Sequence, residues 1–392
     1  MKWQPSPALA RLGGYAFDEL GVQVRQLRDA GVNVIDFGVG DPSYPTPGLV
    51  RQAAASALDT FASAGYPSYV GQPEFRAEIC KWFNRRFGPS LAPDREVTVT
   101  MGSKEAVFHF PMAVLQPGDI VLMPAPGYPP YRTGTYFAGG VPYGYPVLRE
   151  NGYAPDFDAI PEEIARRTRV LWFNYPNSPT GACASDDTFR KAVDFCRHYE
   201  IILASDEAYT ELYFGEAPRS ALEFGKEGII VFQSLSKRSA MTGYRIGWAC
   251  GDENLVQLFR KLKTNIDSGV PNFIQAAAMA ALQDEDHVAA ARTEYAAKQE
   301  TMLDAFRQAG LDAHPSQATI YLWQKTPGGM SDVDYAKALL APQVACAVMP
   351  GSWVSEPLPD GTNPGAGYVR WALCPSQSDV EEAGRRIQLI SL

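Results

Sequence analysis

The sequence predicts an α/β protein in which a mainly parallel sheet is covered by helices, with a smaller C-terminal domain after it. From about residue 95, short apolar runs alternate with helical patterns, and polar loops follow the ends of those runs. Strands that alternate with helices pair in parallel and are buried on both faces. With 392 residues, of which 46% are hydrophobic and 20% charged, the chain is long enough for two domains and a large core.

Six apolar runs predict the strands of this sheet, and they span residues 97–100, 120–123, 170–173, 201–204, 229–232 and 246–249. Helices are predicted over 104–115 and 187–199, and the segment 272–309, rich in Ala, Gln and Glu, predicts a helix that leads into the smaller domain. We expect an N-terminal arm with part of the small domain at 1–45, a large domain at 46–284 and a small domain at 285–392.

Composition excludes several classes of function. A net charge of -9 argues against nonspecific binding to nucleic acid or anionic membranes. The six cysteines are scattered without CxxC pairs or zinc spacing, which predicts reduced thiols and no metal site. Because the N-terminus lacks a signal-peptide core and no run reaches about 18 apolar residues, we expect a cytoplasmic protein.

The loop after the apolar run 229–232 holds the most informative residues. Ser234 and Ser236 precede Lys237, and Arg245 follows eight positions later. A lysine can hold an aldehyde cofactor as a Schiff base, while hydroxyl groups and an arginine bind its phosphate. The alternative is a surface lysine in a polar loop.

Two further loops carry candidate cofactor ligands. Asp206 directly follows the buried run 201–204, where an unpaired carboxylate would be costly, so a pyridinium nitrogen is a suitable partner; helix capping is the alternative. Tyr209 is placed to hydrogen-bond a phenolic oxygen. Ser103 and Lys104 begin a helix after a strand, as in phosphate-binding loops, although this signal is weak and Lys104 is expected to be solvated.

Three more positions have both a functional and a structural interpretation. Tyr128 follows the second strand, where it could stack on a cofactor ring or simply pack. The loop 174–181 contains two prolines and a glycine, so its amide or hydroxyl groups could face the edge of the sheet, or it is simply a tight turn. Arg370 lies in an apolar run and suits either a substrate carboxylate or a structural salt bridge.

Taken in order, the motifs resemble those of the class I and II aminotransferases, pyridoxal-phosphate enzymes of fold type I. The resemblance runs from about residue 38 to 374, through GxGDPxxxTP, YxxxxGxxxxR, GSKEA, PGYPxY, NxPxSPTG, DExY, SxSK and a late arginine. It implies a large domain, a smaller α+β domain, pyridoxal 5'-phosphate as cofactor and a homodimer with shared active sites. Three loops, at residues 102–106, 126–129 and 265–269, are most similar to those of LL-diaminopimelate aminotransferases and their relatives.

The resemblance also implies roles for single residues. Lys237 corresponds to the Schiff-base lysine and proton carrier, and Asp206 and Tyr209 to the partners of the ring nitrogen and the phenolic oxygen. Residues that correspond to the remaining cofactor contacts are Ser103, Lys104, Tyr128, Asn174, Ser178, Ser234, Ser236 and Arg245, with Tyr66 reaching the neighbouring subunit's phosphate. Those on the substrate side are Gly40, Tyr128 and Arg370, the last for the α-carboxylate.

Two positions depart from the family pattern. Ser178 stands where an asparagine normally bonds the phenolic oxygen, and Arg238 stands where a small or hydroxyl residue is common. Asn174, Asn177 or water could compensate for the missing asparagine. We therefore expect amino-group transfer from an L-amino acid to a 2-oxo acid. The alternatives are elimination or replacement, cyclisation or oxidation on the same cofactor, or a regulator that kept the fold without the chemistry.

Overall fold

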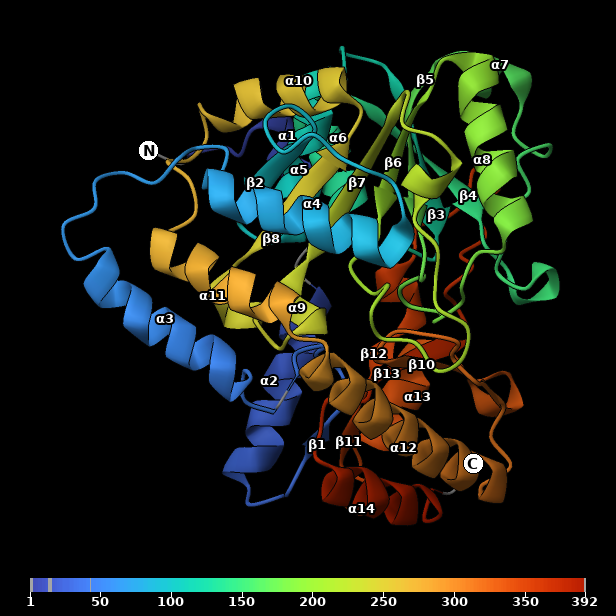
Figure 1. The fold of residues 1–392 in the computed structure, drawn as a ribbon. Helices are drawn as coiled ribbons and strands as arrows, with labels where there is room; N and C mark the ends of the chain where they lie inside the picture. Colours follow the sequence, from blue (N-terminus) through green and yellow to red (C-terminus); the bar gives the residue numbers. More distant parts are fainter. Residues whose placement is uncertain (1–2, 13–15, 43, 391–392) are drawn as a thin grey trace.

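The computed structural model describes residues 3–12, 16–42 and 44–390, and a seven-stranded sheet forms its centre (Figure 1). The strands lie in the order β2-β8-β7-β6-β5-β3-β4. Their bounds in that order are Val97–Thr100, Gly247–Gly251, Ile229–Ser234, Ile202–Asp206, Thr168–Asn174, Ile120–Ala125 and Val141–Pro146. The predicted α/β architecture is confirmed.

The sheet is mainly parallel, and its exception is β8, which runs antiparallel to both β2 and β7. The edge strand β4 had not been predicted. Its sequence contains Pro142, Gly144 and Pro146, which interrupt the apolar pattern. Proline is tolerated in a strand when it lies at the edge of the sheet, where one side of the backbone needs no partner.

Alternate residues of the central strands enter two separate cores, because successive side chains of a strand point to opposite faces. In β5, Leu171 and Phe173 pack in one cluster while Val170 and Trp172 pack in the other. The apolar runs are thus continuous because both faces are buried.

Helices cover both faces and connect the strands (Figure 1). In the large domain they are α3 Gly48–Thr60, α4 Pro73–Phe87, α5 Ser103–Val114, α6 Pro130–Phe137, α7 Glu162–Ala165, α8 Asp186–Tyr199, α9 Leu235–Arg238, α10 Glu253–Lys263 and α11 Asn272–Gln283. The predicted helix over 272–309 is two helices, since α12 spans Asp286–Gln308 and residues 284 and 285 lie between them. Short 3-10 helices lie at Arg149–Asn151, Ala221–Phe224, Thr242–Tyr244, Pro327–Gly329 and Gly351–Val354.

A third core surrounds a smaller sheet with the order β12-β13-β10-β9. Its strands are Met349–Pro350, Tyr368–Ala372, Tyr321–Lys325 and Ala313–His314. The N-terminal segment joins this part of the molecule, because β1 (Ile35–Asp36) pairs in parallel with β11 (Cys346–Ala347). The other helices are α1 Pro7–Ala10, α2 Ala16–Asp29, α13 Asp332–Leu339 and α14 Gln377–Ile387.

The described residues also bear on membranes, metals and cysteines. Among them, no helix has the length and apolar character needed to cross a bilayer. In the same residues, no cluster of three His, Cys, Asp or Glu side chains is arranged to hold a metal ion. All six cysteines are free thiols, and four of them are buried.

Candidate active site

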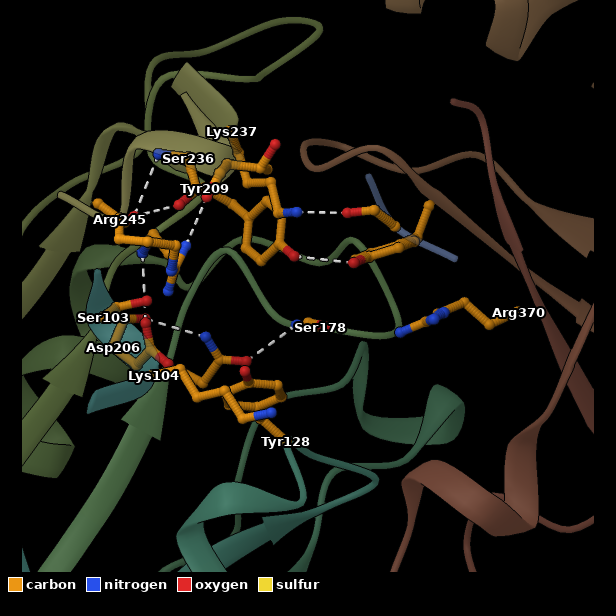
Figure 2. A pocket seen from close by; sticks show the side chains of 16 residues that line it. Ser103, Lys104, Tyr128, Ser178, Asp206, Tyr209, Ser236, Lys237, Arg245 and Arg370 are labelled. Carbon is orange, nitrogen blue, oxygen red and sulfur yellow. Dashed lines mark hydrogen bonds between the residues drawn. The ribbon is translucent and has the colours of Figure 1, made fainter. Parts of the chain in front are cut away.

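The polar residues at the strand ends line one cavity of about 310 Å³ between the two sheets (Figure 2). Because β5, β6 and β7 are parallel neighbours, their carboxyl ends meet at one edge and bring Asn174, Asp206 and Ser234 together. The lining residues are Gly40, Ser103, Lys104, Tyr128, Asn174, Ser178, Asp206, Ala208, Tyr209, Ser234, Ser236, Lys237, Thr242, Arg245, Tyr321 and Arg370. Every predicted site residue except Tyr66 is in this set.

Lys237 projects its amine into the cavity from the single turn of α9, which begins where β7 ends. The backbone N–H of Ser236 donates to Ser234 Oγ at 3.1 Å, so the serine fixes the start of that turn. Lys237 Nζ donates to the carbonyl oxygen of Gly40 (Figure 2). A primary amine is therefore held at the cavity wall by a residue of the N-terminal segment, and the surface-loop alternative is wrong.

Asp206 lies on the floor of the cavity and is only 5% exposed. Its Oδ2 accepts a hydrogen bond from the Tyr131 hydroxyl at 2.8 Å, and the backbone N–H of Ala208 donates to Oδ1 at 3.4 Å. Burial raises the pKa of Asp206 to about 6 because neither donor carries a full positive charge. Turns follow Asp206 in place of a helix, so the capping alternative is wrong. The carboxylate suits a cationic ring nitrogen.

The end of the cavity where α5 begins is suited to bind an anion. Gly102 precedes the helix with φ +76° and has no side chain to cap the first N–H groups. A Cβ at Gly102 would lie 2.5 Å from Arg245 Nη2, so the glycine lets the guanidinium approach the helix start. Arg245 also donates to the carbonyl oxygens of Thr242 at 2.7 Å and Met101 at 3.2 Å. The helix N-terminus, this guanidinium and the nearby hydroxyls fit a phosphate dianion.

The opposite side of the cavity carries a guanidinium from the smaller sheet. Arg370 is 7% exposed, and its Nη2 donates to the carbonyl oxygen of Gly38 at 2.9 Å. Its Cζ lies 4.3 Å from the centre of the Tyr321 ring. Within the part of the chain that the structure describes, these contacts hold the arginine without an acidic side chain, which gives no support to the structural salt-bridge alternative. The charge is free to bind a carboxylate in the cavity.

The loop after β5 has a different organisation from that expected. Asn174 donates from Nδ2 to the carbonyl oxygen of Asp206 at 2.9 Å and accepts from Ser178 N at 2.9 Å. Its amide is therefore engaged with the backbone at both ends. Asn177 accepts from Thr180 and does not line the cavity. Asn174 and Ser178 both line the cavity at this position, and the amide of Asn174 is held by the backbone contacts described above.

One predicted site residue, Tyr66, and one departure from the family pattern, Arg238, lie outside the cavity. Tyr66 is 86% exposed and lies outside the cavity, on the segment between α3 and α4. Arg238 points away from the cavity, because its guanidinium donates to the Ala281 carbonyl oxygen and to Glu285 Oε1, each at 2.7 Å. Arg238 thus ties the lysine-bearing turn to the break between α11 and α12.

Sequence reasoning missed Tyr321 and Thr242. Tyr321 belongs to the apolar run 320–323, which contains no motif and reads only as a buried strand. Thr242 follows Lys237 by five residues, within the loop already singled out, so its hydroxyl could have been included. A mostly apolar cavity of about 500 Å³ adjoins the first one and shares Lys104, Tyr128, Ser178, Arg245 and Arg370 with it.

A buried carboxylate, an amine and a helix start suited to a phosphate lie around one cavity, and these are the groups that pyridoxal phosphate needs in an enzyme. The family model for aminotransferase class I and II matches residues 32–387. LL-diaminopimelate aminotransferase of Aquifex aeolicus (strain VF5) is 41% identical over 391 residues, which is 99% of both chains. The chain belongs to the class I and II aminotransferases, and it is a pyridoxal-phosphate-dependent transferase of fold type I.

Solved structures agree with this assignment. Substrate-bound BacF from Bacillus subtilis has a TM-score of 0.92 at 29% identity and matches 99% of this chain and 98% of its own. A single mutant of Thermus thermophilus aspartate aminotransferase has a TM-score of 0.92 at 27% identity, with both chains fully covered. Together the comparisons favour amino-group transfer over elimination, cyclisation or oxidation, and over a regulator without chemistry.

Proposed function

We propose that this aminotransferase takes the amino group of an L-amino acid with a polar, diaminopimelate-like side chain and passes it to a 2-oxo acid. The observation that carries the proposal is the cavity that brings Lys237, Asp206 and Arg370 together. The names of the relatives at about 40% identity support the choice of donor. The apolar walls of the adjoining cavity suit the methylenes of a long side chain, and Lys104 on its rim suits a distal carboxylate.

Each residue of the cavity has a task in this proposal. Pyridoxal phosphate, when bound, supplies a carbonyl carbon that exchanges amino groups and a ring that accepts electrons from the substrate Cα. Lys237 holds the cofactor and then moves a proton to and from Cα. Asp206 keeps the ring nitrogen protonated, and Tyr209 donates to the phenolic oxygen. Arg370 binds the α-carboxylate, with Gly40 beside the substrate.

The remaining contacts position the cofactor. Tyr128 and Ser178 line the cavity. Tyr128 would stack on the ring, and Ser178 would take the place of the asparagine that bonds the phenolic oxygen. The phosphate would be bound by the N-terminus of α5, including Ser103 and the backbone of Lys104, and by Ser234, Ser236 and Arg245.

We also propose a homodimer in which each cavity is completed by the partner subunit. The support is Tyr66, whose side chain is exposed in the single chain. The motif around it resembles that of a tyrosine that reaches the cofactor phosphate of the neighbouring subunit. A shared site requires isologous contacts between identical chains. The proposed domain division remains 1–45, 46–284 and 285–392, and the proposed compartment is the cytoplasm.

The test is the absorbance spectrum of the cofactor-loaded protein while single amino acids are added without an acceptor. LL-diaminopimelate is compared with L-lysine, which lacks the distal carboxylate, and with L-2-aminopimelate, which lacks the distal amine. We expect LL-diaminopimelate to convert the absorbance band of the cofactor attached to Lys237 (the lysine-bound band) into the pyridoxamine band at a lower concentration than the other two amino acids. Equal conversion by all three would contradict the proposed donor, and turnover that leaves the band intact would contradict amino-group transfer. Lys237→Ala, which cannot form the band, is the control.

A further inference from the structure

Tyr321 is an aromatic side chain of the smaller sheet that contacts both ends of the cavity. Its hydroxyl lies 2.9 Å from the hydroxyl of Tyr209, and its ring lies beneath the guanidinium of Arg370, 4.3 Å from Cζ to the ring centre. The side chain is 5% exposed and lines the cavity. It therefore joins a residue after β6 of the large sheet to a residue of β13.

The strand register explains this placement. In the antiparallel pair β10 and β13, Tyr321 is opposite Ala372 and Trp323 is opposite Arg370. Residues two apart in a strand share a face, so Tyr321 and Arg370 are diagonal neighbours on the face turned to the cavity. A long guanidinium side chain can reach across that diagonal and stack on the ring.

Gly40 leaves the space that the Tyr321 hydroxyl occupies. A Cβ built at Gly40 would lie 2.2 Å from Tyr321 Oη and 2.9 Å from two ring carbons. The carbonyl oxygen of the same glycine accepts the hydrogen bond from Lys237. The Tyr321 hydroxyl thus packs between Gly40, whose carbonyl oxygen holds Lys237, and the hydroxyl of Tyr209.

We propose that Tyr321 is a positioning residue that couples the cofactor side of the cavity to the carboxylate side. Either hydroxyl of the pair could donate; in the proposed arrangement Tyr321 donates to the oxygen of Tyr209, which would leave the Tyr209 proton for the cofactor's phenolic oxygen. Its ring holds Arg370 in the orientation that accepts the α-carboxylate. The inference rests on the proposed roles of Tyr209 and Arg370, and it adds a residue that acts through both of them.

The hydroxyl and the ring can be removed separately. Tyr321→Phe keeps the ring and loses the hydroxyl, whereas Tyr321→Leu loses both. Without the hydrogen bond from the Tyr321 hydroxyl, Tyr209 becomes a weaker donor to the phenolic oxygen. The proton that this oxygen shares with the nitrogen of Lys237 is then released at a higher pH. The midpoint of the pH titration of the lysine-bound absorbance band should rise by roughly 0.4–1 pH unit in both variants. Loss of the ring should additionally raise the KM for the amino donor roughly 5- to 30-fold in Tyr321→Leu alone.

The experiment measures both quantities in the cofactor-loaded, full-length protein. Tyr335→Phe is the matched control, because Tyr335 is fully buried in the same core but does not line the cavity. We expect both readouts to stay unchanged in the control. Thermal unfolding confirms that each variant is folded, and Tyr321→Phe preserves the packed ring if Tyr321→Leu fails to fold.

The outcomes separate this proposal from the proposed function. A reactive wild-type enzyme whose midpoint does not move in Tyr321→Phe would overturn the coupling to Tyr209. An equal rise in KM in Tyr321→Phe and Tyr321→Leu would overturn the role of the ring. A wild-type protein that shows no change with any amino acid would instead overturn the proposed function, and the assignment of Tyr321 with it.

Discussion

Replacing Asp206 by asparagine should stabilise the cofactor-free protein and at the same time disable the enzyme. The carboxylate is buried, and it accepts hydrogen bonds from two neutral donors, the Tyr131 hydroxyl and the Ala208 N–H. A buried charge without a countercharge costs folding free energy. Asparagine fills the same space, its oxygen can still accept from Tyr131, and it carries no charge.

The magnitude follows from the pKa of Asp206, which burial raises from 3.8 to about 6. Because the folded state binds the proton more tightly than the unfolded chain, the free energy of unfolding falls as pH rises from about 4 to about 6. Above that range the loss is complete and amounts to about 3 kcal/mol, at 1.36 kcal/mol for each unit of pKa. Asp206→Asn should therefore be more stable than wild type by about 3 kcal/mol at pH 8 and by about 1 kcal/mol at pH 4.5.

The assay is urea unfolding of cofactor-free wild-type protein and variant at both pH values, since a shift of midpoint at constant slope reports stability. In the loaded enzyme the variant should slow the half-reaction at least about 100-fold, because the ring nitrogen loses its countercharge. Glu207→Gln is a matched control, because it also removes a buried carboxylate but one outside the cavity. Burial raises the pKa of Glu207 to about 7, and its carboxylate accepts hydrogen bonds from Ser205 and Ala221. A stability difference that is the same at pH 4.5 and pH 8 would refute the reasoning.

Three further outcomes are expected. Arg370→Lys keeps the charge but loses the planar pair of donors, so the KM for the amino donor should rise roughly 10-fold or more, with the pH midpoint of the absorbance band unchanged; an unaltered KM would contradict the carboxylate role. Ser178→Asn restores the family's amide donor and should lower that midpoint by roughly 0.4–1 pH unit, whereas no shift would mean that position 178 does not face the phenolic oxygen. Mixing Tyr66→Ala with Lys237→Ala should recover activity through hybrid dimers that contain one complete site; a mixture no more active than Tyr66→Ala alone would exclude sharing.

Much of the large sheet could be predicted because each buried strand has a sequence pattern of its own that can be recognised without knowledge of its partners. Runs such as 170–173 and 229–232 are continuous apolar segments, and residues of both faces are buried in the structure. Since parallel strands place their carboxyl ends at one edge, the polar residues after those runs could be placed around one cavity without knowledge of any contact. Lys237 and Asp206 follow from this rule, whereas Arg245 precedes the antiparallel strand β8 and is placed by its short spacing from Lys237.

The direction in which each polar side chain points could not be predicted in the same way. Arg238 is next to the lysine in sequence, yet its guanidinium binds Glu285, 47 residues away, and leaves the cavity. Asn174 could have compensated for Ser178, but its amide is engaged by Asp206 and by Ser178 itself. Such choices depend on partners that only the folded chain brings within hydrogen-bond distance.

The sequence by itself determined the alternation of strands and helices, the loops that line the cavity and the class of chemistry, because each depends on residues close together in the chain. Only the tertiary structure decided that Tyr321 lies between Tyr209 and Arg370. That contact requires the antiparallel register of β10 and β13 and the packing of the smaller sheet over the edge of the larger one. Pairing between strands about 45 residues apart is set by the packing of the whole core, and an apolar run such as 320–323 does not reveal which of its side chains will face a cavity.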